Sequence, residues 1–128
     1  MPAYNFMPQF ASLVENGEKT MTIRKTDRGA KPGDTAFLYT GQRTKSCRLL
    51  GKGTIVHVNR VKIGRMSNGQ PYADVISGSG KTARFERCWL DVFAHCEGFD
   101  SGEAFVGWFD RKYGLPFHGF VHAWYPML

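Results

Sequence analysis

The residues best suited to chemistry lie together in one run of the chain, Gly17-Glu18-Lys19-Thr20-Met21-Thr22-Ile23-Arg24. This run combines an ammonium group, two hydroxyls and a guanidinium, which binds anions through parallel N–H donors. Its polar and apolar side chains alternate, so a strand would place Thr20, Thr22 and Arg24 on one face. The run therefore predicts either a cleft lined by these polar groups or an ordinary edge strand with a solvated face, and composition alone favours the edge strand.

A short helix before the run would position it. Pro8 suits the first position of a helix, and Gly17 suits the residue that ends one. Between them, three apolar residues recur at the spacing of a buried helical face: Phe10, Leu13 and Val14. Lys19 and Thr22 have opposite parity on a regular strand. A site that uses both therefore requires Lys19 to lie in the turn, or a bulge between them.

The remaining chain has the pattern of short strands separated by turns, with two helices near its end. We expect strands over 35–39, 53–58, 60–65, 72–76, 84–88 and 120–124, and helices over 90–96 and 99–113. Asn68-Gly69 is a hairpin signal. There is no alternation of strands and helices typical of a parallel sheet. The pattern predicts an α+β fold with one domain over 1–128, a small and partly open β-barrel with short flanking helices.

Composition bounds the class of protein. A chain of 128 residues with 42% hydrophobic content can bury one core. No stretch of about 18 apolar residues is present and the first nine residues lack the features of a secretory signal, so we expect no membrane partner. The three cysteines are odd in number and lack paired spacing, which favours a reducing, cytoplasmic location. His118 and His122 have no suitably spaced carboxylate or thiol, so we expect neither a metal nor another cofactor.

Positive charge is concentrated in the first half of the chain. Residues 1–65 hold twelve lysines and arginines against four acidic residues, a net charge of +8, whereas residues 66–128 carry −2. Such asymmetry is typical of a protein that binds a polyanion such as RNA, although solubility alone also explains it. Arg43 and Lys45 lie in an expected basic loop over 41–52, and Tyr39 precedes it as a candidate for stacking on a base.

Glu103 has two possible roles. Asp100-Ser101-Gly102-Glu103 fits a capping box in which Asp100 caps the helix and Glu103 reaches back to it. A glutamate at a helix N-terminus would also be a stable anion that orients a lysine or a ligand amine.

Several segments together resemble the ASCH family. They are the run 17–24, the turn Pro32-Gly33-Asp34, the segment 97–101 with Glu103 and Phe105, and the last strand around 120–124. ASCH domains are similar in fold to PUA domains, which are small β-barrels with flanking helices, and the family is linked to RNA. One branch consists of small bacterial amidohydrolases that act on N4-acetylcytidine. The resemblance implies catalytic roles for Lys19, Thr22 and Glu103.

These residues support two interpretations from different classes. In the first, an RNA-binding module holds RNA or a nucleotide-related ligand in a basic cleft. In the second, the same cleft is the site of a metal-independent hydrolase. This enzyme would be either a ribonuclease or an amidohydrolase that acts on a modified nucleoside, N4-acylated cytidine. Thr22 would then attack the acyl carbon, while Lys19 takes its proton if desolvated or otherwise stabilises the oxyanion. Glu103 would orient Lys19, and Arg24 would hold a phosphate or a base edge.

Overall fold

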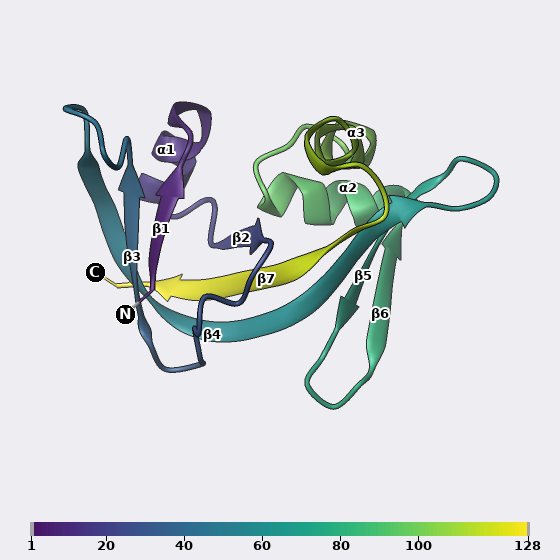
Figure 1. The fold of residues 1–128 in the computed structure, drawn as a ribbon, viewed down its shortest axis with the longest axis horizontal. Coiled ribbons are helices and arrows are strands. Elements are labelled where there is room, and N and C mark those ends of the chain that lie inside the picture. The colour runs from purple at the N-terminus through teal and green to yellow at the C-terminus, as the bar shows by residue number, and fades with distance from the viewer. Residues whose placement is uncertain (1, 128) are drawn as a thin grey trace.

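The computed structural model describes residues 2–127 and shows an α+β architecture, as the sequence predicts. Within these residues the chain forms seven strands and three helices (Figure 1). The strands are β1 (Ala3–Phe6), β2 (Met21–Arg24), β3 (Thr35–Thr40), β4 (Arg48–Arg65), β5 (Pro71–Ile76), β6 (Thr82–Glu86) and β7 (Phe117–Pro126). The helices are α1 (Pro8–Glu15), α2 (Arg87–Cys96) and α3 (Gly102–Tyr113). None of these helices combines the length and the apolar character needed to cross a membrane.

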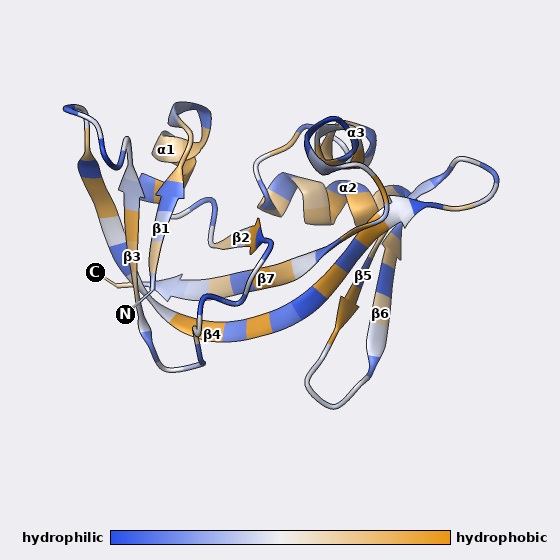
Figure 2. Cartoon of the chain, viewed as in Figure 1, coloured by the Kyte–Doolittle hydropathy of each residue, from blue (hydrophilic) through white to orange (hydrophobic). Residues whose placement is uncertain are grey.

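One long, curved strand, β4, joins the whole sheet. Its first part pairs with β3 and its last part with β5, while β7 pairs with it along 53–63. The order is β1-β3-β4-β5-β6, with β2 attached through β7. Within residues 2–127 no pairing joins β6 or β2 back to β1, so the sheet stays open. Hydrophilic and hydrophobic residues alternate along β4, as expected of a strand with one covered face (Figure 2).

The apolar side chains form two core clusters at opposite ends of β4. The first core cluster lies between α1 and strands β1, β3 and β4, and includes Tyr4, Phe6, Phe10, Leu38, Ile55 and Trp124. The second lies between helices α2 and α3 and the sheet, and includes Val61, Ile63, Leu90, Phe105, Phe109 and Phe117. Phe99, which precedes α3, packs against both clusters. In Figure 1, α1, which covers the first cluster, stands apart from α2 and α3, which cover the second.

Several elements differ from those the sequence predicts, and β1 was not predicted. Strand β6 and helix α2 begin earlier than expected, α3 begins later, at Gly102, and β7 is longer than the expected strand over 120–124. We expected an exposed loop over 41–52 and two separate strands after it, but β4 runs unbroken from Arg48 to Arg65. Pairing with β7 carries β4 through this region, and a register shift between Ile55 and His57 lets the strand bend without ending. Helix α3 is capped by Ser101 rather than Asp100, because the Ser101 hydroxyl accepts the N–H of Ala104 at 3.1 Å.

Candidate functional site

A concave pocket of about 340 Å³ lies between the two core clusters. Strand β1 and helix α1 form one wall, α3 and the segment before it form the other, and β2 with the turn after it contributes the base. The lining includes Lys19, Thr22 and Arg24, three of the residues that the sequence singles out. In Figure 1, β2, which carries Thr22 and Arg24, lies between α1 on one side and α2 and α3 on the other.

Lys19 lies in the turn before β2, as a shared site with Thr22 requires. Its backbone N–H donates to the carbonyl of Leu13 at 2.9 Å, which ties the turn to the end of α1. The side chain is buried, and its Nζ donates to the backbone carbonyl of Glu97 at 2.8 Å and lies 3.4 Å from Glu97 Oε1. Burial lowers the pKa of Lys19, opposed by the nearby carboxylate of Glu97.

Glu97 is the acidic partner in this pocket. It follows the last turn of α2 and is 3% exposed, and burial raises the pKa of its carboxyl group against the pull of Lys19. Its Oε2 is buried without a hydrogen-bond partner among residues 2–127. Burial thus disfavours the charged form of both Lys19 and Glu97, while the attraction between the two charges opposes this effect.

Thr22 and Arg24 share the pocket-facing side of β2. Thr22 is buried, and its Oγ1 accepts a hydrogen bond from Arg24 Nε at 3.1 Å, which leaves the hydroxyl proton of Thr22 free for another acceptor. Arg24 Nη2 donates to the carbonyl of Asn5 at 2.8 Å, and its guanidinium lies over the rings of Tyr4 and Phe6. Burial lowers the pKa of Arg24 to about 10, so the guanidinium remains charged at neutral pH.

Aromatic side chains cover the wall formed by α3. Phe99, Trp108 and Tyr113 line the pocket, and Trp108 packs edge-on against Phe99. Such a wall suits a flat, partly apolar ring, which can stack on aromatic faces. The pocket therefore joins a reactive polar floor to a surface for a planar ligand.

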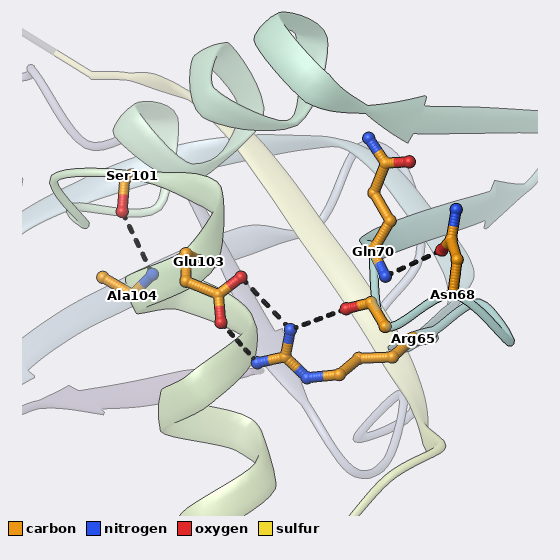
Figure 3. Close-up of polar contacts among 7 residues, drawn as sticks. Arg65, Asn68, Gln70, Ser101, Glu103 and Ala104 are labelled. Carbon is orange, nitrogen blue, oxygen red and sulfur yellow. Dashed lines mark hydrogen bonds and ion pairs between the residues drawn. The ribbon is translucent and has the colours of Figure 1, made fainter.

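Glu103 does not line the pocket, so the catalytic set expected from the sequence is not brought together there. Figure 3 shows its carboxylate facing Arg65 at the end of β4, with both oxygens accepting from the guanidinium at 2.7 and 3.1 Å. The same guanidinium also donates to the carbonyl of Gly69 in the hairpin. The side chain of Glu103 is 67% exposed. It braces the hairpin against α3 instead.

The other predicted ligand-binding residues lie outside the pocket. Arg43 and Lys45 are exposed in the loop before β4, and Tyr39 is half-buried on β3. Arg43 has a positive φ of 65°, an uncommon conformation for a residue other than glycine. The structure places these three on the same end of the sheet but not with Lys19.

Glu97 is the residue that the sequence interpretation missed, although a signal for it exists. Leu90, Phe93, Ala94 and Glu97 follow the spacing i, i+3, i+4 and i+7 of a single helical face. The first three are buried in the structure, so Glu97 continues a buried stripe. A glutamate at a buried position is uncommon unless it is paired, which is itself a functional signal.

Within residues 2–127 no group of three or more histidine, cysteine or acidic side chains is arranged to hold a metal ion. Comparison with protein-family models, with curated proteins and with solved structures finds no match to this chain.

Proposed function

We propose that the pocket hydrolyses an amide bond in a small substrate that carries a planar ring, with an N-acylated nucleobase as the class that fits it. The observation that carries this proposal is the buried Lys19–Glu97 pair, which lines the same concave pocket as Thr22. Structural lysines are usually exposed, whereas a buried lysine with a lowered pKa can serve as a base.

In the proposed reaction, Thr22 Oγ attacks the acyl carbon while the neutral amine of Lys19 takes the hydroxyl proton. The bond between the acyl carbon and nitrogen then breaks, and the leaving nitrogen receives that proton. Water hydrolyses the resulting acyl-threonine and regenerates Thr22, so the net reaction consumes one water and releases a carboxylic acid and an amine.

Glu97 takes the role that the sequence interpretation gave to Glu103. It holds the amine of Lys19 in place and exchanges a proton with it, so the amine can act as a base in one step and as an acid in the next. Arg24 remains cationic and is fixed by two hydrogen bonds, so it is the group suited to stabilise the oxyanion.

The proposal extends to the family and the barrel. We infer an ASCH domain with a PUA-like β-barrel that is opened along one side. The curvature of β4, the helices at the rim and the run that carries Lys19, Thr22 and Arg24 support this assignment.

Incubation with a panel of N-acylated nucleosides, followed by mass spectrometry, tests the activity. We expect loss of the acyl group from at least one member, N4-acetylcytidine first among them. Thr22→Ala, Lys19→Arg and Glu97→Gln should each lower turnover at least a hundredfold, because each removes a proton-transfer or nucleophilic group. Thr20→Ala and Glu103→Gln are the matched controls, and both should retain turnover. Turnover that survives Thr22→Ala and Lys19→Arg would refute the mechanism.

A second candidate function is RNA binding by the basic half of the chain. The net charge of +8 over residues 1–65 favours it, and Arg43 and Lys45 are exposed and separate from the pocket. Binding of RNA without loss of any acyl group would favour this candidate, and cleavage of the RNA would identify a ribonuclease.

A further inference from the structure

The cations that line the pocket outnumber its acidic groups. Among residues 2–127 the lining includes five of them, Lys19, Arg24, Lys25, Arg28 and Lys112, against the single carboxylate of Glu97. That carboxylate pairs with Lys19, while no carboxylate of the described chain lies within 4.0 Å of the other four. Among residues 2–127, Arg24, Lys25, Arg28 and Lys112 thus form no salt bridge, and they give the mouth of the pocket a net positive charge.

Two of these cations converge from different elements on one ring. Lys25 follows β2 and its Nζ lies 5.2 Å from the ring centre of Tyr113. Lys112 is on α3, and its Nζ lies 5.6 Å from the same ring and 4.9 Å from that of Trp108. Both ammonium groups are thus held near the same aromatic side chain of the pocket, and an anion bound there would be attracted to both.

A third cation is held near the opening by a strained backbone. Arg28 has a φ of 55°, and its Nη1 donates to the carbonyl of Ala3 at 2.8 Å. This bond uses one of five N–H donors, so the guanidinium keeps a free edge for an anion.

We infer that Lys25, Arg28 and Lys112 form a phosphate subsite at the mouth of the pocket, so that its preferred ligand is a nucleoside monophosphate rather than a nucleoside. The inference rests on the proposed function for the identity of the planar ring, which the aromatic wall would hold. A small phosphorylated molecule fits better than a strand of RNA, because the phosphate subsite belongs to a pocket of only about 340 Å³ and the basic loop with Arg43 and Lys45 does not line it.

Isothermal titration calorimetry tests the subsite with matched ligands: cytidine and cytidine 5′-monophosphate, adenosine and adenosine 5′-monophosphate, and inorganic phosphate alone. We expect each monophosphate to bind at least tenfold more tightly than its nucleoside at low salt. The double variant Lys25→Gln/Lys112→Gln should abolish that advantage and leave nucleoside affinity within twofold. Both side chains are exposed, so the variant should fold, which circular dichroism can verify.

The control is Lys81→Gln, which removes a charge from an exposed loop outside the pocket and should leave the tenfold advantage unchanged. Equal affinity for nucleoside and monophosphate, or an equal loss in the control, would overturn the subsite. A single-stranded hexanucleotide that binds more tightly than the monophosphate and is weakened by Arg43→Ala/Lys45→Ala alone would also overturn it in favour of RNA.

These outcomes are separable from those of the hydrolase test. A phosphate advantage in a protein that hydrolyses no acylated substrate would support the subsite and refute the hydrolase. Turnover of an acylated nucleoside by a protein that binds nucleoside and monophosphate equally tightly would support the hydrolase and refute the subsite.

Discussion

A buried lysine and a buried glutamate, such as Lys19 and Glu97, each lose hydration that surface charges keep. Removal of one partner leaves the other uncompensated. We expect Lys19→Met to lower the free energy of unfolding by about 3–5 kcal/mol at pH 7.5, measured by urea denaturation, because Glu97 then stays buried without its cation.

The same variant should show a characteristic pH dependence. Burial raises the pKa of Glu97 in the folded state. In Lys19→Met, the folded protein therefore keeps a proton on Glu97 at pH values where the unfolded chain, with its ordinary glutamate pKa, has already released it. The destabilisation caused by Lys19→Met should therefore shrink as the pH falls from 7.5 towards 5. The double variant Lys19→Met/Glu97→Gln removes the titrating group and should not show this dependence. A pH-independent difference between wild type and Lys19→Met would contradict this account.

Of the four polar residues that make up the site, the sequence singled out Lys19, Thr22 and Arg24 and missed Glu97. Lys19, Thr22 and Arg24 are neighbours in the chain, so local alternation alone places them near one another. Glu97 is 78 residues away from Lys19, and only the packing of α2 against the rest of the fold brings them together. Glu103 was chosen because the resemblance to the ASCH family implied a glutamate downstream of the run 17–24, whereas its capping pattern concerned only its own helix.

Strand β2 depends on a close approach to β7. A Cβ added at Gly119 would lie 2.5 Å from the backbone oxygen of Arg24 and 2.7 Å from the ring of Phe117. We expect Gly119→Ala to destabilise the protein by about 1–3 kcal/mol and to weaken ligand binding, because β2 must move and carries Thr22 with it. Gly51→Ala is the matched control in β4, where an added Cβ meets nothing within 4 Å. Thermal denaturation and calorimetry measure both effects, and equal behaviour of the two variants would argue against this role of Gly119.

A buried histidine on β7 ties three segments together. His122 Nδ1 accepts the hydroxyl of Tyr4 at 2.7 Å, and its Nε2 donates to the carbonyl of Thr26 at 3.0 Å. Burial lowers the pKa of His122 in the folded state. Near pH 6 the unfolded chain therefore binds a proton on this imidazole, whereas the folded chain does not.

The contribution of His122 to the free energy of unfolding should therefore be fully present above about pH 6.5. Below that pH it should decrease, by at most about 1.4 kcal/mol per pH unit. His122→Gln should flatten this slope between pH 7.5 and 5.5. His118→Gln, at an exposed position of the same strand, should leave the slope as in the wild type. Urea denaturation across this range measures the slopes, and identical slopes in all three proteins would exclude His122 as its source.

The elements that the sequence predicted well are those with local signals. Pro8 begins α1, Gly114 ends α3 with a positive φ, and the Asn68-Gly69 hairpin connects β4 to β5. The full length of β4 could not be predicted, because its glycines and polar residues at 51–53 resemble a loop. Long-range pairing with β3 and β7 holds that region extended.

On the scale of the whole molecule, charge governs association with polyanions. If RNA binds the basic half, removal of each cation that binds a phosphate should reduce the slope of log affinity against log salt by about 0.7 for a single strand. Arg43→Ala/Lys45→Ala should lower this slope and weaken binding to all sequences alike, as measured by fluorescence anisotropy at several salt concentrations. The charge-matched control is Lys81→Ala/Arg111→Ala, which removes two exposed cations from the acidic half. Affinity that does not change with salt would contradict the prediction.

The order of local patterns in the sequence was sufficient to predict the α+β class. It was not sufficient to predict whether the sheet closes into a barrel. Closure depends on which edge strands meet, and in residues 2–127 the β5–β6 hairpin extends away from β1 rather than towards it (Figure 1). No local pattern in β6 specifies that direction.

The division of the interior into two clusters affects how the width of the pocket can change. Its walls belong to separately packed bodies that share β4, β7 and the side chain of Phe99. We therefore expect a slight change in the bend of these two strands to widen or narrow the pocket while both interiors stay intact. Entry and release of a ligand should then require only flexure of the sheet, with no strand detached and no core side chain exposed to water.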